Sequence, residues 1–415
     1  MSNRRTAWLC LPLIAALATS ALADDTDAPP KAPTSSSKTY EWVFHYYMAY
    51  DNNLEKCAKP ILNMLRKGLT NDKVCVLVSA DLRDTDGMTR TVITSGGRTV
   101  TRLSEEGSAD EAVLKTELEW VKTFRAKRYA LVFLNHGGGL GQMSYDENPG
   151  ANKRAWLYPP RVNEVVSRWK ASLSGSVELL FLQQCGKGSL ENYYAFRNSA
   201  KFVMGSQTVV GAPNTYYVAT LRRVCAKPDL DGAALAELIT ATESPRMFTT
   251  YTTFSSAALK ELPERINAAL EPLLKVEGDA FKAFKLGTLQ TCFKFPSQRQ
   301  LFFDGQALLE SLYAANDLDR APLEAFVTWT KERLITSHRV SPLKTKRAGT
   351  WSGYSLFVPF SANGLGKHKE HYSIYSDTKL PALYERVRKD VRRQLLARRK
   401  AQRRRAKKAA GAGAK

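Results

Sequence analysis

Two residues that can do covalent chemistry follow two apolar segments of this 415-residue chain. His136 stands in the segment YALVFLNHGGGLG, and Cys185 stands in the segment VELLFLQQCGKGS. In each segment the apolar run stops, the reactive side chain follows, and a glycine comes directly after it. A thiol and an imidazole can act together as a nucleophile and its acid–base partner, so this pair is the first candidate for catalysis.

The apolar runs before these two residues predict the elements that position them. Residues 130–134 and 177–182 are too short for a buried helix and barely alternate between polar and apolar side chains. Such runs are typical of strands covered on both faces, as in a parallel sheet. Active sites of open parallel sheets lie beyond the carboxyl ends of the strands, so we expect His136 and Cys185 at one sheet edge.

Strands and helices are predicted to alternate through the first half of the chain. The predicted strands cover residues 41–49, 74–79, 130–134 and 177–182 and the segment FVMGS. A hairpin is predicted around Gly96-Gly97, formed by RTVIT and RTVTRL. The predicted helices cover residues 161–173 and 190–199. Ser108, with Glu111 three residues later, is typical of a capping box at the start of another helix. The alternation favours an α/β fold in which a mostly parallel sheet is flanked by helices. After about Cys225 a mixed helical and strand region follows, with a late strand in GYSLFVPF.

The first residues are typical of a secretory signal peptide. Arg4 and Arg5 precede an apolar run over residues 7–18 and the small-residue site Ala21-Leu22-Ala23. We therefore expect cleavage after residue 23, a flexible linker over residues 24–39, and export to the periplasm or beyond. A membrane anchor is the alternative, but the run is short for spanning a bilayer. Losing Cys10 would leave 6 − 1 = 5 cysteines, an odd number in an oxidising compartment.

The net charge of +21 is concentrated at the end of the chain. Residues 385–415 hold 14 basic and 2 acidic side chains, which gives 14 − 2 = +12. We expect a basic helix there that ends in a small-residue tail. A block of like charge is either a solvated tail or an electrostatic attachment to an anionic polymer or membrane surface. No aromatic side chains are interleaved after Tyr384, so the tail carries no specific nucleic-acid motif.

Other chemistries have weaker support in the sequence. HGGGLG lacks the Rossmann spacing and CGKGS lacks the residue order of a P-loop, which argues against nucleotide binding. His45 lies in an apolar strand and is expected in the core. The sequence requires no cofactor. Calcium is possible at the acidic turn with Asp81, Asp84 and Asp86, although the turn lacks EF-hand spacing and a solvated loop is the alternative.

Four segments occur in the order found in clostripain-family cysteine peptidases. The chain resembles that family in YYMAYDNNLE, NHGGGLG, QQCGKGSLE and FVMGSQ, within about Tyr40 to Val218, and in the later GYSLFVPF. This resemblance implies a caspase-like fold. The segment QQCG is also similar to the start of the caspase signature, whose histidine lies about 50 residues upstream. The spacing here is 185 − 136 = 49, and Lys187 replaces the final glycine of that signature.

The resemblance implies a cysteine endopeptidase that hydrolyses peptide or protein substrates through an acyl-enzyme thioester. Cys185 would be the nucleophile and His136 the catalytic histidine, with no third residue demanded. The backbone N–H groups of Gly137 and Cys185 would form the oxyanion hole. A catalytically inactive binding protein on the same scaffold and an enzyme that transfers rather than hydrolyses are the alternatives.

The substrate pocket departs from the family pattern. Gln183 stands two positions before the cysteine, where the family carries an acidic residue that favours basic P1 residues. Ser206 and Gln207 stand where a Ser-Glu-Glu-like segment is expected. Without those carboxylates the pocket should not favour Arg or Lys at P1, and a neutral or an acidic P1 residue stays possible.

The chain divides into predicted regions around this site. The signal and linker are followed by a peptidase core over residues 40–225, a packed C-terminal region over residues 226–384, and the basic tail over residues 385–415. The segment YDENPGANKRAW, with Lys153-Arg154, suits an exposed loop of the kind nicked in caspase-like zymogens. Self-cleavage after Lys153 or Arg154 conflicts with a pocket that does not favour basic P1 residues. Cleavage by another protease and the absence of cleavage are equal alternatives.

Overall fold

The computed structural model describes most of the chain after residue 37. The described residues are 38–83, 87–104, 107–149, 153–284, 288–289, 291–295, 300–343, 351–360, 365–366 and 368–412. The predicted signal peptide and almost all of the predicted linker lie outside this set.

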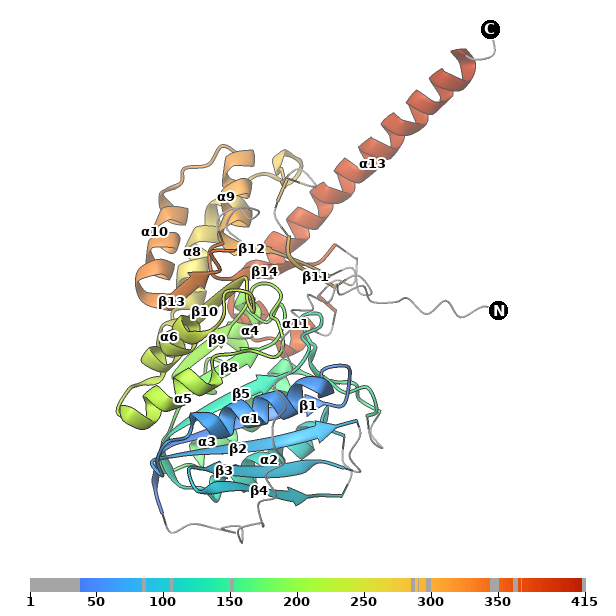
Figure 1. The fold of residues 1–415 in the computed structure, drawn as a ribbon. Coiled ribbons are helices and arrows are strands. Elements are labelled where there is room, and N and C mark those ends of the chain that lie inside the picture. The colour runs from blue at the N-terminus through green and yellow to red at the C-terminus, as the bar shows by residue number, and fades with distance from the viewer. Residues whose placement is uncertain are drawn as a thin grey trace.

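Nine strands of the described residues form one twisted sheet (Figure 1). Their order is β13 (Ile335–Val340), β10 (Thr250–Ser255), β9 (Phe202–Gly205), β8 (Ser176–Gln183), β5 (Ala126–Leu134), β1 (Tyr40–Tyr50), β2 (Val74–Leu82), β3 (Thr89–Thr94) and β4 (Gly97–Arg102). Pairing is parallel from β9 to β2 and antiparallel at both edges. The predicted mostly parallel sheet is confirmed, and β3 and β4 form the predicted hairpin.

The central strands are buried on both faces because helices cover both sides of the sheet. Side chains alternate along β1, so Phe44, Tyr46 and Met48 join one apolar core while Val43 and Tyr47 join the other. The first core contains residues of α1 (Ala58–Gly68), α5 (Tyr217–Ala226) and α6 (Gly232–Thr242). The second contains residues of α2 (Glu111–Lys122) and α3 (Pro159–Ala171). This is the three-layer arrangement expected of a parallel sheet.

The C-terminal region extends the core and also adds strands to the main sheet. Its helices α8 (Leu262–Lys275), α9 (Gly305–Ala315) and α10 (Ala321–Trp329) lie beyond the β13 edge (Figure 1). A second, antiparallel sheet joins β11 (Thr291–Phe295), β12 (Gln300–Asp304) and β14 (Ser355–Val358). The late strand predicted in GYSLFVPF is β14. Because β10 and β13 pair with the main sheet, this region shares its hydrogen-bonded framework.

Helix α13 (Leu380–Ala412) begins in the core and then leaves it (Figure 1). Leu383, Val387 and Val391 are buried in the core, whereas Leu395 and Leu396 are 43% and 55% exposed. The helix crosses residue 385, where the basic tail was predicted to begin, without a break. No helix of the described part of the chain combines the length and the apolar character needed to cross a membrane.

The predicted capping box at Ser108 is wrong. Helix α2 begins one residue after Asp110, whose side chain accepts a hydrogen bond from the Ala112 N–H. Ser108 is instead fully buried, and its N–H and hydroxyl donate to Asp81 and Asp146. Because both groups of Ser108 are used by tertiary contacts, Asp110 provides the cap.

Candidate active site

The pairing of β5 with β8 brings the two candidate catalytic residues to the same edge of the sheet. Leu134 pairs with Gln183 in this parallel ladder. His136 and Cys185 each come two residues after that pair, 136 − 134 = 2 and 185 − 183 = 2. Adjacent strands lie about 4.8 Å apart, so the two turns that follow must lie side by side.

Gly137 lets these two turns touch. A Cβ atom at residue 137 would lie 3.0 Å from the Cys185 nitrogen and would overlap the Cys185 carbonyl oxygen. Only glycine fits such a close approach of two backbones. Gly137 therefore allows the His136 turn and the Cys185 turn to pack against each other.

The His136 imidazole is partly buried and is held by a residue that the sequence analysis did not single out. Its Nε2 lies 2.6 Å from Asn53 Oδ1. In the tautomer with the proton on Nε2, Asn53 accepts that hydrogen and Nδ1 keeps a lone pair for proton transfer. Burial lowers the pKa of His136, so the ring is neutral near pH 7. Asn53 lies in the motif YDNNLE, which was its only sequence signal.

The residue before His136 is held by a set of amide hydrogen bonds. Asn135 Nδ2 donates to the Ala49 and Tyr145 carbonyls, the latter at 2.8 Å. Asn52 Nδ2 lies 3.2 Å from Asn135 Oδ1 and 2.7 Å from the same Tyr145 carbonyl. These contacts join the ends of β1 and β5, so the histidine turn is part of a rigid edge.

The Cys185 sulfur contacts the backbone of the segment after β9. The Val210 N–H donates to Cys185 Sγ at 3.3 Å, and the Val210 carbonyl lies 3.6 Å from the same sulfur. An N–H donor favours the thiolate, which is the nucleophilic form of cysteine. The turn itself is held by Gly186 and Gly188, whose N–H groups donate to the Thr208 and Ser206 carbonyls.

Gln183, predicted in the substrate pocket, is buried and its amide is engaged on both sides. Its Nε2 donates to Asn214 and to the Tyr217 hydroxyl, and its Oε1 accepts from the Tyr216 hydroxyl at 2.7 Å. Asn214 in turn donates to Glu243. Glu243 lies 60 residues further along the chain, 243 − 183 = 60, so its local sequence does not mark it as a neighbour of Gln183.

Glu243 is a buried carboxylate whose oxygens are fully engaged by neighbouring donors. It accepts from the Asn214 amide, from the N–H and hydroxyl of Thr215, and from the Ser244 N–H. Burial raises its pKa above the usual value. The Glu243 carboxylate therefore binds donors of the protein itself.

Ser206 and Gln207, also predicted in the pocket, are fully buried in the structure. Gln207 Nε2 lies 3.0 Å from Asp304 Oδ2 and 2.6 Å from the Tyr354 carbonyl, and Gln207 Oε1 accepts from the Gly353 N–H. Gln207 thus connects the core to the C-terminal region. Ser206 Oγ accepts a hydrogen bond from the Thr208 N–H. Neither side chain lies on an open surface of the site.

Three buried carboxylates lie together beside the histidine edge. Asp51, Asp81 and Asp146 each offer one oxygen, and these atoms lie within 4.8 Å of one another. Burial, opposed by the Ser108 hydrogen bond and reinforced by the neighbouring carboxylates, raises the pKa of Asp81 to about 6. Such an all-oxygen set is the kind that calcium prefers. Asp84 and Asp86, which were predicted to act together with Asp81, lie outside the described residues.

The predicted processing loop is only partly described, since residues 150–152 lie outside the described set. Lys153 is exposed and has a left-handed backbone with φ of 54°. Arg154 Nη1 lies 2.8 Å from Glu111 Oε2, and Glu111 also accepts from the Tyr158 N–H. The guanidinium of Arg154 would have to leave this ion pair before a protease could bind it as a P1 residue.

Two other predictions concern residues outside the site. His45 is buried in β1 as predicted, with Nε2 3.0 Å from Ser79 Oγ, and burial lowers its pKa to about 3. The five cysteines that remain after Cys10 are all free thiols, and four of them are buried, namely Cys57, Cys75, Cys225 and Cys292.

The family comparison agrees with this geometry. The model of the clostripain family (peptidase C11) matches residues 46–261, just over half of the chain. The chain belongs to the clostripain family. The matched range includes both turns of the site and the strands before them. No curated protein sequence matches this clostripain-family chain significantly.

Solved structures show the same caspase-like fold. An inactive zymogen of a C11 protease from Parabacteroides distasonis is 19% identical, with a TM-score of 0.61 over 83% of this chain and 99% of the other. A secreted C11 cysteine protease from Bacteroides thetaiotaomicron, in complex with an irreversible peptide inhibitor, is 16% identical, with a TM-score of 0.62 over 82% of this chain and 99% of the other. At these identities the likeness establishes the fold, which is the predicted one.

Substituting Gly137→Ala should damage this clostripain-family site, because the new methyl group must push the Cys185 turn away. We expect Cys185 to react differently with iodoacetamide and thermal unfolding to occur at a lower temperature. Gly278→Ala is the matched control, because a Cβ there would meet no atom within 4 Å. Equal behaviour of the two variants would contradict the close contact between the turns.

Proposed function

We propose that this chain is an exported cysteine endopeptidase in which Cys185 is the nucleophile and His136 transfers protons. The single observation that carries the proposal is the β5–β8 register, together with the contact of Gly137 with the Cys185 backbone. Family membership supports peptide hydrolysis as the reaction. The signal-like N-terminal sequence supports export, as does the secreted C11 protease of the same fold.

The proposed reaction uses groups that lie at the sheet edge. His136 takes the proton of the Cys185 thiol, and the resulting thiolate attacks the peptide carbonyl carbon. The new oxyanion is bound by the N–H groups of Gly137 and Cys185. His136 gives a proton to the departing amine, so the C–N bond breaks and an acyl-enzyme thioester is left. His136 then takes a proton from water, which attacks the thioester and releases the acid, and His136 returns the proton to the Cys185 sulfur.

The P1 residue is proposed to be other than Arg or Lys. A basic side chain needs a carboxylate in a buried pocket, because desolvating a cation without a partner is costly. Position 183 offers an amide, and Glu243 behind it is already engaged by internal donors. A neutral P1 side chain fits this environment best.

Cys185→Ala and His136→Ala should each lower kcat/KM for a peptide substrate by about 10,000-fold or more, because each removes a group that the reaction requires. Cys57→Ala and His371→Ala are the matched controls and should keep full activity. A peptide library assayed with the parent enzyme would rank P1 residues, and we expect Arg and Lys to be poor. Hydrolysis that persists in Cys185→Ala would rule out the proposed chemistry, and binding without hydrolysis by the parent protein would favour the inactive-scaffold alternative.

We also propose that the carboxylates of Asp51, Asp81 and Asp146 hold calcium. The folded-state pKa of Asp81, about 6, lies above the value of about 3.9 expected in the unfolded chain. A raised carboxyl pKa means that its stability contribution is lost as pH rises from about 4 through about 6. A bound divalent cation would remove this penalty by neutralising the ionised carboxylates.

Asp81→Asn tests the calcium proposal through stability. In EDTA at about pH 7.5 the variant should gain about 3 kcal/mol in free energy of unfolding over the parent protein, and the gain should vanish near pH 4. Added calcium should stabilise the parent protein but not Asp81→Asn. The exposed Asp229→Asn is the control. No calcium effect on the parent protein's unfolding would rule the site out.

The projecting half of α13 is proposed to attach the enzyme to an anionic polymer or membrane surface. Its exposed basic side chains include Arg398, Arg399 and Lys400. Replacing these three with Glu lowers the charge of residues 385–415 from +12 to 12 − 6 = +6 and should weaken binding to phosphatidylglycerol vesicles and to polyphosphate, because the attraction is electrostatic. The same change at Arg222 and Arg223, which are exposed on α5, should leave binding intact. Binding by the parent protein that is insensitive to added salt would contradict the proposal.

A further inference from the structure

Lys187 lies two residues after Cys185 and is fully buried. Its Nζ donates to the Gly139 carbonyl at 2.8 Å and to the Gln142 carbonyl at 2.6 Å. Both acceptors belong to the glycine-rich loop that begins directly after His136. One side chain from the cysteine turn therefore holds the loop of the histidine turn.

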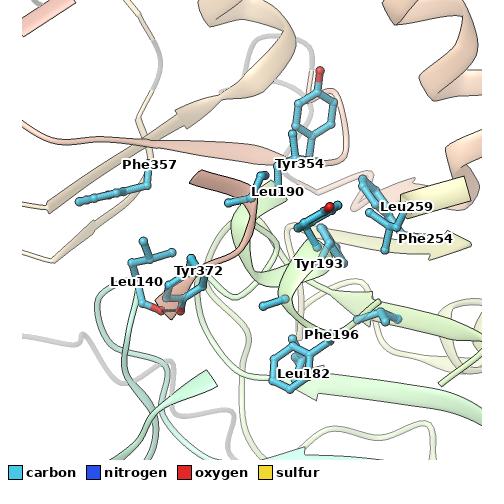
Figure 2. Packing of buried hydrophobic residues seen from close by; sticks show 14 of the residues in the cluster. Leu140, Leu182, Leu190, Tyr193, Phe196, Phe254, Leu259, Tyr354, Phe357 and Tyr372 are labelled. Carbon is cyan, nitrogen blue, oxygen red and sulfur yellow. Dashed lines mark hydrogen bonds between the residues drawn. The ribbon is translucent and has the colours of Figure 1, made fainter. Parts of the chain in front are cut away.

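The same loop is held from a second direction. Tyr372 follows α11 (His368–His371), and its hydroxyl donates to the Leu140 carbonyl at 2.7 Å (Figure 2). Within the loop, the Gly138 N–H donates to the Gln142 carbonyl and the Gln142 N–H donates to the Gly139 carbonyl. The two carbonyls that Lys187 binds are thus the two that close the turn. Removing Lys187 would leave them without their buried cationic donor.

A buried ammonium group is expensive to keep unless an anion lies near it. Within the described residues no salt bridge joins Lys187 to a carboxylate, since its hydrogen-bond acceptors are neutral carbonyls. Burial lowers the pKa of Lys187 to about 7, and the charge that acts against this decrease is that of Cys185. The attraction is mutual, so a charged Lys187 favours the ionised form of the Cys185 sulfur.

We propose that Lys187 is a positioning residue of the peptidase site, which fixes the His136 loop against the Cys185 turn and stabilises the Cys185 thiolate by its charge. The inference rests on the proposed nucleophilic role of Cys185. It gives a physical role to the residue that replaces the final glycine of the caspase signature. A lysine that merely packed the turn would affect stability but not the ionisation of the thiol.

The test measures the rate of Cys185 alkylation by iodoacetamide against pH, read on the Cys185 peptide by mass spectrometry. Lys187→Met removes charge and donor, and Lys187→Gln keeps a donor without the charge. In both variants the pH midpoint of alkylation should rise by about one unit or more, because a nearby cation is lost. Lys187→Arg should restore most of the shift. The exposed Lys67→Met is the matched control.

Peptide hydrolysis supplies the second readout. Misplacing the His136 loop should lower kcat by about 100-fold in Lys187→Met, with a smaller change in KM. The kcat of Lys187→Gln should fall less, because its amide can still donate to the loop carbonyls. Lys187→Gln also provides the test if Lys187→Met folds poorly. The alkylation is also repeated with the Lys187 variants in a His136→Ala background. There the midpoint should still rise when Lys187 is replaced, which separates the effect of the Lys187 charge from movement of the His136 loop.

The outcome that would overturn the proposal is an unchanged alkylation midpoint in both neutral variants, or a midpoint that shifts equally in Lys67→Met. Failure of the proposed peptidase function looks different. In that case Cys185→Ala would still hydrolyse peptides, whereas the alkylation midpoint of Cys185 could still respond to Lys187.

Discussion

The parallel pairing of β5 with β8 determines where both candidate catalytic side chains lie. Leu134 and Gln183 are the last paired residues of this ladder, and the reactive residue comes two positions later on each strand. A slip of one residue would turn one of the two side chains to the opposite face of the sheet. The side chains before them pack alternately into two different cores, so a slip would require both faces of the sheet to repack. Gly137 then allows the two turns to meet at backbone distance.

The polar side chains around this edge are buried, and each is hydrogen-bonded within the protein. Asn52 and Asn135 join the strand ends, Lys187 binds the histidine loop, and Gln183 and Gln207 use their amides inside the protein. Buried polar networks of this kind lose much of their value when one member is removed, so they favour a single arrangement of the site. Donors held in place before substrate arrives need no reorganisation during the reaction, which is how oxyanion stabilisation is most effective.

The sequence was sufficient to predict the sheet and the two turns, because buried parallel strands leave continuous apolar runs and the chemistry follows where those runs stop. It was insufficient for contacts made across the fold. Asn53 and Glu243 come from distant segments, and nothing in their local sequence marks them as neighbours of His136 and Gln183.

At some positions contacts with distant segments determine the role of a side chain that its local sequence pattern predicts differently. Ser108 has the spacing of a capping residue, but Asp81 and Asp146 take its hydrogen bonds. Gln207 was expected at the substrate because of its place in a motif, yet its amide binds Asp304 and the Tyr354 carbonyl. Asp81 of the acidic turn after β2 lies beside Asp51 and Asp146, which come from two other segments that the local sequence does not connect with it.

The most direct measurement of the central claim is to trap the nucleophile with a peptide that ends in a thiol-reactive ketone and to locate the adduct by mass spectrometry. We predict a single adduct on Cys185, formed at a rate that depends on His136 and accompanied by complete loss of peptide hydrolysis. An adduct on Cys57, Cys75, Cys225 or Cys292, or full hydrolysis by protein whose Cys185 is completely modified, would contradict it.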